Sequence, residues 1–310
     1  MADYTKLTSQ ELLQLLTHFN LGELYSAAPL EGGQANSSIK ITTEKGLFTL
    51  SICDEKNTAD IDNLTDIMVY LEEQKFPTTR LVKTKAGEKF IFYDRKPVYV
   101  KKFLQGEVYP HLTPQMLQEV GSTMSTLHQL EPIIMMKEFF PYGLEAFSDL
   151  LDGEINHRFT DWLAEKKDFL AQAIDSDMEK CFIHGDIFWD NLLFDNGSLV
   201  ALLDFEEACC YYTLFDLGMA AVGCCSAKGC FDIAKIKELL AGYTAIRPFT
   251  ALEKAQLPVF IEYAAVSASF WRFRQYNIRR PSPQLAESYR ELASLADQIH
   301  TFSGNHLFDE

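Results

Sequence analysis

The feature that most constrains this sequence is a turn signal between two short apolar runs. Asn196-Gly197 lies between the runs 192–194 and 199–203. Asn-Gly is typical of a two-residue β-hairpin turn, because both residues accept a positive φ. Side chains alternate between the faces of a strand, so this hairpin places Asn191 and Asp204 on one face as diagonal neighbours, about 7–8 Å apart. Two oxygen-bearing side chains at that separation can hold one hard cation between them.

Asp186 lies on the segment that leads into the same end of the hairpin. In phosphoryl transfer by kinases, one aspartate orients or deprotonates the acceptor hydroxyl, while an asparagine and a second aspartate hold Mg²⁺ on the phosphates of ATP. The pattern H-x-D-x-x-x-x-N followed by D-F therefore predicts Asp186 as the catalytic residue, with Asn191 and Asp204 as metal ligands. A surface loop with ordinary turn acids would leave both motifs, their order and the intervening hairpin unexplained.

Composition places the chain among ordinary soluble globular proteins. Its 310 residues, 47% of them hydrophobic, suffice for one large domain or two lobes. The net charge of −16 argues against nucleic acid and anionic membranes as partners. No apolar run could span a bilayer, and the N-terminus has no signal-peptide pattern, so we expect a cytoplasmic protein. Seven cysteines without C-x-x-C spacing favour free thiols.

The chain is predicted to be an α+β protein of two lobes. Runs of β-type residues in the first hundred residues predict an antiparallel sheet with strands at 37–42, 47–52, 90–93 and 98–100. Later apolar residues recur at helical spacing and predict helices at 159–173, 219–226, 233–243, 259–276 and 284–301. We therefore expect a nucleotide-binding lobe over 1–102 and a helical catalytic and substrate lobe over 103–310.

A glycine-containing segment precedes the first predicted hairpin. Gly32, Gly33 and Asn36 lie in it, and paired glycines let backbone N–H groups approach a phosphate closely. These three residues are therefore predicted to bind the nucleotide. Kinases place a lysine on the strand after such a loop, but Ser51 occupies that position here. The sequence leaves three alternatives open, Lys40, Lys56 and Lys101.

A β lobe with a glycine loop, followed by a helical lobe with H-G-D-x-x-x-x-N and D-F-E, resembles the aminoglycoside phosphotransferase and choline kinase family. These are protein-kinase-like enzymes that act on small alcohols, and the resemblance covers nearly the whole chain. Protein kinases instead have H-R-D, D-F-G and an A-P-E motif, whereas here Ala208 leads within a few residues to Phe215-Asp216-Leu217-Gly218. The resemblance implies a protein-kinase-like fold with ATP and Mg²⁺ as cofactors.

Within that family the chain is most similar to the homoserine kinases of this fold. The similarity lies in residues 30–36, 203–209 and 239–248, whereas Trp189 stands where those enzymes tend to have arginine. The resemblance implies L-homoserine as the acceptor, a molecule with an ammonium and a carboxylate. Arginine binds carboxylates bidentately. The candidate residues for the two ends of this acceptor are Arg272 and Arg274 for the carboxylate and Glu206 and Glu207 for the ammonium.

Three alternative functions remain open from the sequence. A kinase of the same fold can act on choline, ethanolamine, a sugar or an aminoglycoside, and a choline pocket needs an aromatic cage. The aromatic residues that would supply this cage are Tyr211, Tyr212, Trp271 and Tyr276. A non-catalytic nucleotide-binding protein is favoured by the absent strand lysine but has no need of Asp186. A protein kinase is disfavoured by the missing activation segment.

Overall fold

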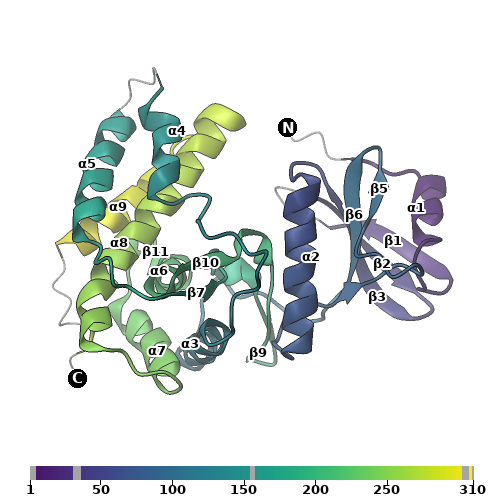
Figure 1. Cartoon of the computed structure of the whole chain (residues 1–310), viewed down its shortest axis with the longest axis horizontal. Coiled ribbons are helices and arrows are strands. Elements are labelled where there is room, and N and C mark those ends of the chain that lie inside the picture. Colours follow the sequence, from purple (N-terminus) through teal and green to yellow (C-terminus); the bar gives the residue numbers. More distant parts are fainter. Residues whose placement is uncertain (1–4, 31–35, 154–157, 302–306, 309–310) are drawn as a thin grey trace. The chain divides into compact units, whose positions relative to one another are not determined.

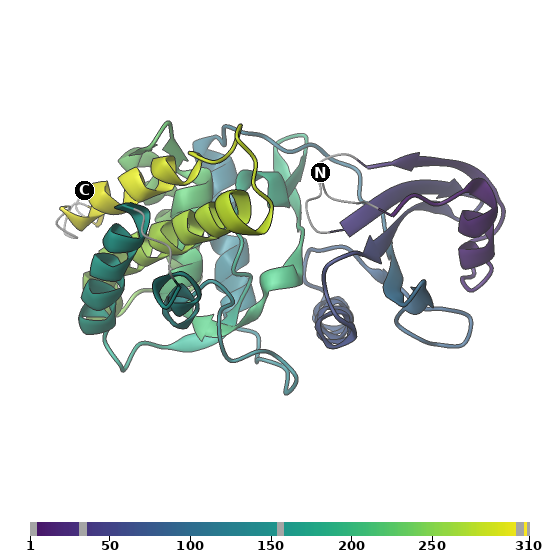
Figure 2. The same cartoon turned by 90° about the horizontal axis from the view of Figure 1, so that it is seen from above.

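The computed structural model describes residues 5–30, 36–153, 158–301 and 307–308. The chain forms two compact units. The first comprises Met1–Glu107 together with Val200–Leu203, and the second comprises Val108–Leu199 together with Asp204–Glu310. Figures 1 and 2 show the strands of the first unit and the helices of the second. The functional division into lobes 1–102 and 103–310 stays a prediction.

The first unit is built on an antiparallel sheet. In its described part the strand order is β1-β2-β3-β6-β4, and β5 also pairs with β6. The elements are α1 (Ser9–Leu16), β1 (Leu24–Pro29), β2 (Asn36–Thr43), β3 (Gly46–Cys53), α2 (Thr58–Glu73), β4 (Leu81–Val82), β5 (Ile91–Tyr93) and β6 (Lys96–Lys102). The four strand runs expected from the sequence lie in β2, β3, β5 and β6.

Helix α1 is capped by local side chains and packs against this sheet. Thr8 and Glu11 form a capping box, in which the Glu11 N–H donates to the Thr8 hydroxyl at 3.3 Å and the Thr8 N–H donates to the Glu11 carboxylate at 2.8 Å. Leu12 and Leu15 on the inner face of the helix join a core with Leu50 of β3. Full burial of each such side chain contributes about 1.5–3 kcal/mol.

The second unit is mainly helical. Its helices are α3 (Pro114–His128), α4 (Ser148–Leu151), α5 (Arg158–Ala173), α6 (Thr213–Cys224), α7 (Ile233–Thr244), α8 (Ala251–Phe273) and α9 (Tyr289–His300). Its short strands are β7 (Lys180–Ile183), β8 (Leu192–Asp195), β9 (Ser198–Leu202), β10 (Cys209–Tyr212), β11 (Ser226–Ala227) and β12 (Cys230–Phe231), of which β9 ends in the first unit. The sheet and the larger helical part confirm the predicted α+β class.

Several predicted helix starts differ from the structure. Helix α6 begins at Thr213 rather than at 219, and every residue of it is buried. A fully buried helix has no polar face, so its sequence lacks the periodicity that would mark its first turn. Helix α8 begins at Ala251, after a capping box of Thr250 and Glu253 that the sequence also indicates, so the predicted run 259–276 covers only its later part. Helix α9 begins at Tyr289 rather than at 284.

Glycines let helices α3 and α7 approach each other closely. A Cβ atom on Gly121 of α3 would lie 2.0 Å from the backbone oxygen of Leu239, and a Cβ atom on Gly242 of α7 would lie 2.0 Å from the backbone oxygen of Gln118. Real Cβ atoms do not come so near, so only glycine fits at either position. The crossing brings the ends of both helices, at His128 and Tyr243, into contact.

All seven cysteines, each within the described residues, are free thiols. Burial raises the pKa of the Cys181 thiol to about 12, and it also raises the thiol pKa of Cys209 and Cys225. Cys230 on β12 is exposed. As for membranes, no helix in the described ranges is long and apolar enough to cross a bilayer.

Candidate active site

The predicted hairpin is present and carries two of the candidate residues at its ends. Strands β8 and β9 form a two-stranded sheet, and the turn between them has φ values of 49° at Asn196 and 84° at Gly197. Asn191 ends a 3₁₀ turn directly before β8. Asp204 follows β9 and adopts a left-handed conformation with φ of 64°. Such a backbone costs a non-glycine residue about 1–2 kcal/mol, and strain of this kind is concentrated at functional sites.

Asp186 and Asn191 are held together by hydrogen bonds. The Asn191 amide nitrogen donates to the backbone oxygen of Asp186 at 2.9 Å and to its carboxylate Oδ2 at 3.0 Å. Because the nitrogen end of the amide faces Asp186, the oxygen end is the atom that remains to face a cation. The amide therefore has the orientation that a metal ligand needs.

The Asp186 carboxyl lies in a strongly negative environment. Burial raises the pKa of Asp186 well above its ordinary value, and the nearby carboxylates of Asp204, Glu207 and Asp190 raise it further. The hydrogen bond from Asn191 acts in the opposite direction. Carboxylates gathered in this way favour a divalent cation between them.

The donor set at this position suits Mg²⁺ rather than a metal that needs a full protein cage. Among the described residues no group of three or more His, Cys, Asp and Glu side chains is arranged to hold one metal ion. Mg²⁺ is usually bound by one or two carboxylates together with water and substrate phosphates. An amide oxygen at Asn191 and a carboxylate at Asp204 fit that requirement.

Asp216 in the first turn of α6 holds the backbone of the loop that carries Asp186. Its carboxylate accepts the N–H of His184 at 3.0 Å and the N–H of Gly185 at 2.7 Å. The Nε2 atom of His128 lies 3.0 Å from the same carboxylate. A side chain of the loop also contacts the loop backbone, since the Asp186 N–H donates to Nδ1 of His184 at 3.2 Å. Both histidines are thus engaged in positioning the loop.

The charge on Asp216 makes these contacts strong. Burial alone raises the pKa of Asp216, but the hydrogen bond and charge of His128 outweigh burial and lower it. Hydrogen bonds to an ionised acceptor are worth about 1.5–3 kcal/mol each. Gly185 is required in the same loop, because its φ is 83° and a Cβ atom there would lie 2.9 Å from the backbone oxygen of Glu207.

The predicted nucleotide residues are only partly covered by the structure. Gly32 and Gly33 lie outside the described residues, and Asn36 begins β2 opposite Cys53. Ser51, at the position expected for a lysine, is buried, and its hydroxyl lies 3.2 Å from that of Ser38.

Strand register places two of the three alternative lysines, Lys40 and Lys101. Lys40 on β2 and Lys101 on β6 both pair with Thr49 of β3, so they share the face of the sheet that carries Ser51. The Lys40 ammonium lies 4.0 Å from the centre of the Phe103 ring. Neither of the two lysines forms an ion pair in the part of the chain that the structure describes. They are cations on the expected face, and no carboxylate among the described residues pairs with either of them.

The two candidate acceptor arginines differ in their contacts. Arg272 at the end of α8 donates to the backbone oxygen of Ser288 at 3.0 Å and lies 3.7 Å from Glu291, so it faces the segment around α9. Arg274 donates to the Asp149 carboxylate at 2.7 Å from a π-helical turn. Its guanidinium lies 5.3 Å from the ring of Tyr142.

Tyr142 connects Arg274 with the acidic residues after Asp204. The Tyr142 hydroxyl lies 3.5 Å from a carboxylate oxygen of Glu207. Glu207 and its neighbour Glu206 belong to the 3₁₀ turn Phe205–Glu207. Tyr142 thus contacts a guanidinium through its ring and a carboxylate through its hydroxyl, and that carboxylate also acts on Asp186. Sequence reasoning missed Tyr142, because its surroundings have no periodic pattern.

The loop 184–191, the hairpin β8–β9 and Asp216 therefore bring together the residues of the predicted site. A model of a phosphotransferase enzyme family matches residues 26–249. The chain belongs to this phosphotransferase family, as the sequence resemblance implied.

Individual relatives and solved structures agree with this assignment. The chain is 29% identical over 290 residues to a homoserine kinase of Phenylobacterium zucineum, an alignment that covers 89% of this chain and 88% of that enzyme. A homoserine kinase of Pseudomonas aeruginosa is 29% identical over 285 residues, covering 88% of each. An amicoumacin kinase structure has a TM-score of 0.75 at 17% identity over 97% of both chains. A microcompartment-associated aminopropanol kinase has a TM-score of 0.73 at 17% identity over 97% of this chain and 99% of its own. The predicted protein-kinase-like fold is confirmed.

Proposed function

We propose that this protein is an ATP-dependent homoserine kinase. It would transfer the γ-phosphoryl group of ATP to the side-chain hydroxyl of L-homoserine. The observation that carries the proposal is the Asp186–Asn191 pair on a loop that Asp216 holds by two backbone N–H groups. The homoserine kinases to which the chain is similar over most of its length support the choice of acceptor.

In the proposed reaction each side chain has a distinct role. Asp186 would orient the acceptor hydroxyl and receive its proton as the new P–O bond forms and the bond to ADP breaks. Asn191 and Asp204 would hold Mg²⁺, which when bound neutralises charge on the phosphates. The raised pKa of Asp186 brings this carboxyl closer to the range in which a general base accepts a proton.

Nucleotide binding is proposed for the sheet of the first unit. The roles of Gly32, Gly33 and Asn36 remain predictions based on the glycine segment. Lys40 and Lys101 are proposed to replace the missing strand lysine, because both lie on the face that carries Ser51 and pair with no described carboxylate.

Arg274 is the better candidate for the acceptor carboxylate. Its link through Tyr142 to Glu207 supports a site with a cation at one end and carboxylates at the other, which suits an amino acid. Arg272 contacts the α9 region instead. Arg274 is itself ion-paired with Asp149 at 2.7 Å, so an acceptor carboxylate would have to compete with Asp149 for this guanidinium. Glu206 and Glu207 remain the proposed partners of the ammonium. Nucleic acid is not an expected partner, and the cytoplasm stays the predicted location.

The proposal is tested by measuring ADP release with Mg-ATP and each of four acceptors, L-homoserine, choline, ethanolamine and kanamycin. Turnover with homoserine alone is expected. Asp186→Asn should lower kcat at least about 100-fold while Mg-ATP binding, measured by calorimetry, persists. The matched control is Asp195→Asn, an exposed residue of the adjoining hairpin, which should retain turnover. Turnover of another acceptor in preference to homoserine would show that the acceptor is wrong.

A further inference from the structure

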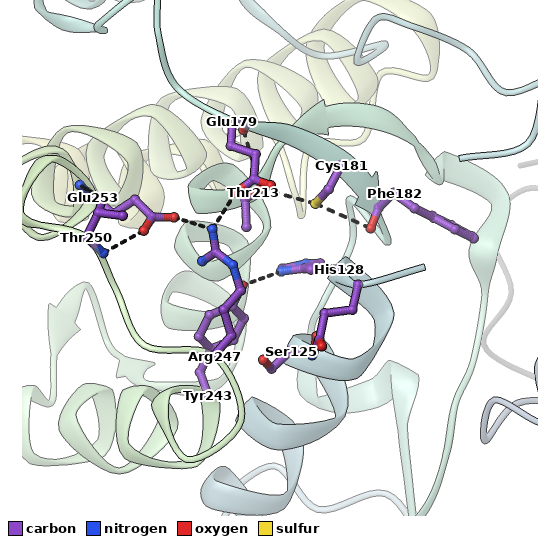
Figure 3. Close-up of polar contacts among 11 residues, drawn as sticks. Ser125, His128, Glu179, Cys181, Phe182, Thr213, Tyr243, Arg247, Thr250 and Glu253 are labelled. Atoms are coloured by element: carbon purple, nitrogen blue, oxygen red, sulfur yellow. Dashed lines mark hydrogen bonds and ion pairs between the residues drawn. The ribbon is translucent and has the colours of Figure 1, made fainter. Parts of the chain in front are cut away.

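The segment 239–248, similar to one in homoserine kinases, takes no part in the reaction as proposed above. It covers the end of α7 and the connection to α8. Two of its side chains contact other elements of the second unit. Tyr243 is fully buried, and the guanidinium of Arg247 is partly exposed. Figure 3 shows both residues with the groups that they contact.

Tyr243 is joined to the catalytic loop by a continuous chain of hydrogen bonds. Its hydroxyl lies 3.0 Å from Nδ1 of His128, and Nε2 of His128 lies 3.0 Å from the carboxylate of Asp216. That carboxylate accepts the backbone N–H groups of His184 and Gly185. The side chains of Tyr243, His128 and Asp216 thus connect the end of α7 with the loop that carries Asp186.

The chemistry of the imidazole fixes the direction of one of these bonds. An ionised carboxylate only accepts hydrogen bonds, so Nε2 of His128 must carry a proton. The other nitrogen, Nδ1, bonds with the Tyr243 hydroxyl, which donates to a neutral imidazole and accepts from a charged one. Burial raises the pKa of Tyr243, which keeps this hydroxyl protonated. In both states the tyrosine holds the ring so that its Nε2 proton faces Asp216.

Arg247 contacts the residue before strand β7, at the end of the strand that lies away from the loop. Its guanidinium donates to Glu253 at 2.7 Å and also to Glu179, the residue directly before β7. Glu253 is fixed in turn by the capping box of α8. The start of β7 is therefore tied to the junction between α7 and α8. The end of β7 is tied to the same junction through Tyr243.

We propose that Tyr243 and Arg247 are positioning residues for the catalytic loop. Tyr243 sets the imidazole that orients Asp216, and Arg247 sets the start of β7, so the two together fix the strand before the loop at both of its ends. The close approach of α3 and α7 at Gly121 and Gly242 is what places Tyr243 within reach of His128. This inference rests on the proposed phosphoryl transfer, because turnover is its main measure.

Tyr243→Phe is the decisive variant. The ring stacks on Phe249 with centroids 5.2 Å apart, and phenylalanine keeps this contact while removing only the hydroxyl. We expect kcat to fall about 10-fold, as for the loss of one buried hydrogen bond, with the KM values for ATP and homoserine unchanged. The matched control is Tyr263→Phe, which also removes a buried hydroxyl; this hydroxyl bonds with that of Tyr211 at 2.7 Å and accepts the N–H of Leu144 at 2.7 Å. It should lower the unfolding midpoint by a similar amount but keep kcat within about twofold.

Further measurements separate positioning from a general loss of stability. Arg247→Met should lower kcat, and Arg247→Lys should restore part of it, since lysine can still reach one carboxylate. The ¹⁵N shifts of the His128 imidazole, recorded without substrate, should change in Tyr243→Phe, because Nδ1 loses its hydrogen-bond partner. A kcat equal to that of the wild type, an equal loss in Tyr263→Phe, or unchanged imidazole shifts would overturn the inference. If no acceptor is turned over by the wild type, the proposed function fails, while the imidazole shifts still decide the positioning claim.

Discussion

A single methyl group at the crossing of α3 and α7 should destabilise the second unit. In Gly242→Ala the new Cβ atom would lie 2.0 Å from the backbone oxygen of Gln118 and 2.5 Å from its Cα atom. Relieving this overlap requires the helices to separate by about 1.5 Å, the difference from an ordinary contact of about 3.5 Å. Both partners are backbone atoms of helices, so no side-chain rotation can relieve the overlap.

Two opposing effects determine the size of the change. Alanine in a helix is favoured over glycine by about 1 kcal/mol. Overpacking costs about 1–3 kcal/mol and occasionally more, and a clash with backbone belongs at the upper end of that range. We therefore expect a net loss of about 2 kcal/mol, which corresponds to a fall of about 4–8 °C in the unfolding midpoint for a unit of this size.

Calorimetry and turnover together test this prediction. Ala241→Gly, at the neighbouring exposed position of α7, should lose about 1 kcal/mol from helix propensity alone and retain kcat. Gly242→Ala should lose more stability, although helix propensity favours it, and it should also lose turnover because Tyr243 moves away from His128. A raised midpoint in Gly242→Ala would refute the reasoning, since propensity would then outweigh the contact.

Two further predictions concern the first unit. Lys40→Met and Lys101→Met should each weaken Mg-ATP binding by about 10-fold, whereas Lys102→Met, on the opposite face of the sheet, should leave it unchanged in calorimetry; equal effects from all three would contradict the register argument. A hydrogen bond from Tyr93 lowers the pKa of Glu11 from 4.5 to about 2, so the stability that this carboxylate contributes is complete above pH 4.5 and is lost as the pH falls towards 2. Glu11→Gln should therefore reduce the acid dependence of the unfolding midpoint over that interval, and an unchanged acid dependence would show that these hydrogen bonds are absent in solution.

Local rules predicted the features that depend on neighbouring residues. The Asn196-Gly197 turn needs only two residues that accept positive φ, and the capping box at Thr8 and Glu11 needs only two side chains three positions apart. The proximity of Asp186 and Asn191 was also predictable, because one short loop links them, whereas their catalytic and metal-binding roles stay predictions. In each case the interacting groups lie within about twenty residues of one another.

Contacts between distant segments were not predictable in the same way. Arg272 and Arg274 are two positions apart on a helical turn, so they face different sides, and sequence cannot tell which side meets Tyr142. The bond between Tyr243 and His128 joins residues 115 positions apart. This bond depends on the close approach of α3 and α7 at Gly121 and Gly242. A glycine in a helical sequence does not by itself indicate which helix it will contact.

The distribution of cysteine thiols has a practical consequence for studying the two units. Burial holds most of them protonated and out of reach of reagents, whereas Cys230 on β12 is exposed. A maleimide dye should therefore attach there selectively. A second dye, introduced by replacing an exposed residue of the first unit such as Phe92 on β5 with cysteine, would complete a fluorescence-transfer pair. Such a pair would report on the separation of the units in solution, before and after nucleotide is added.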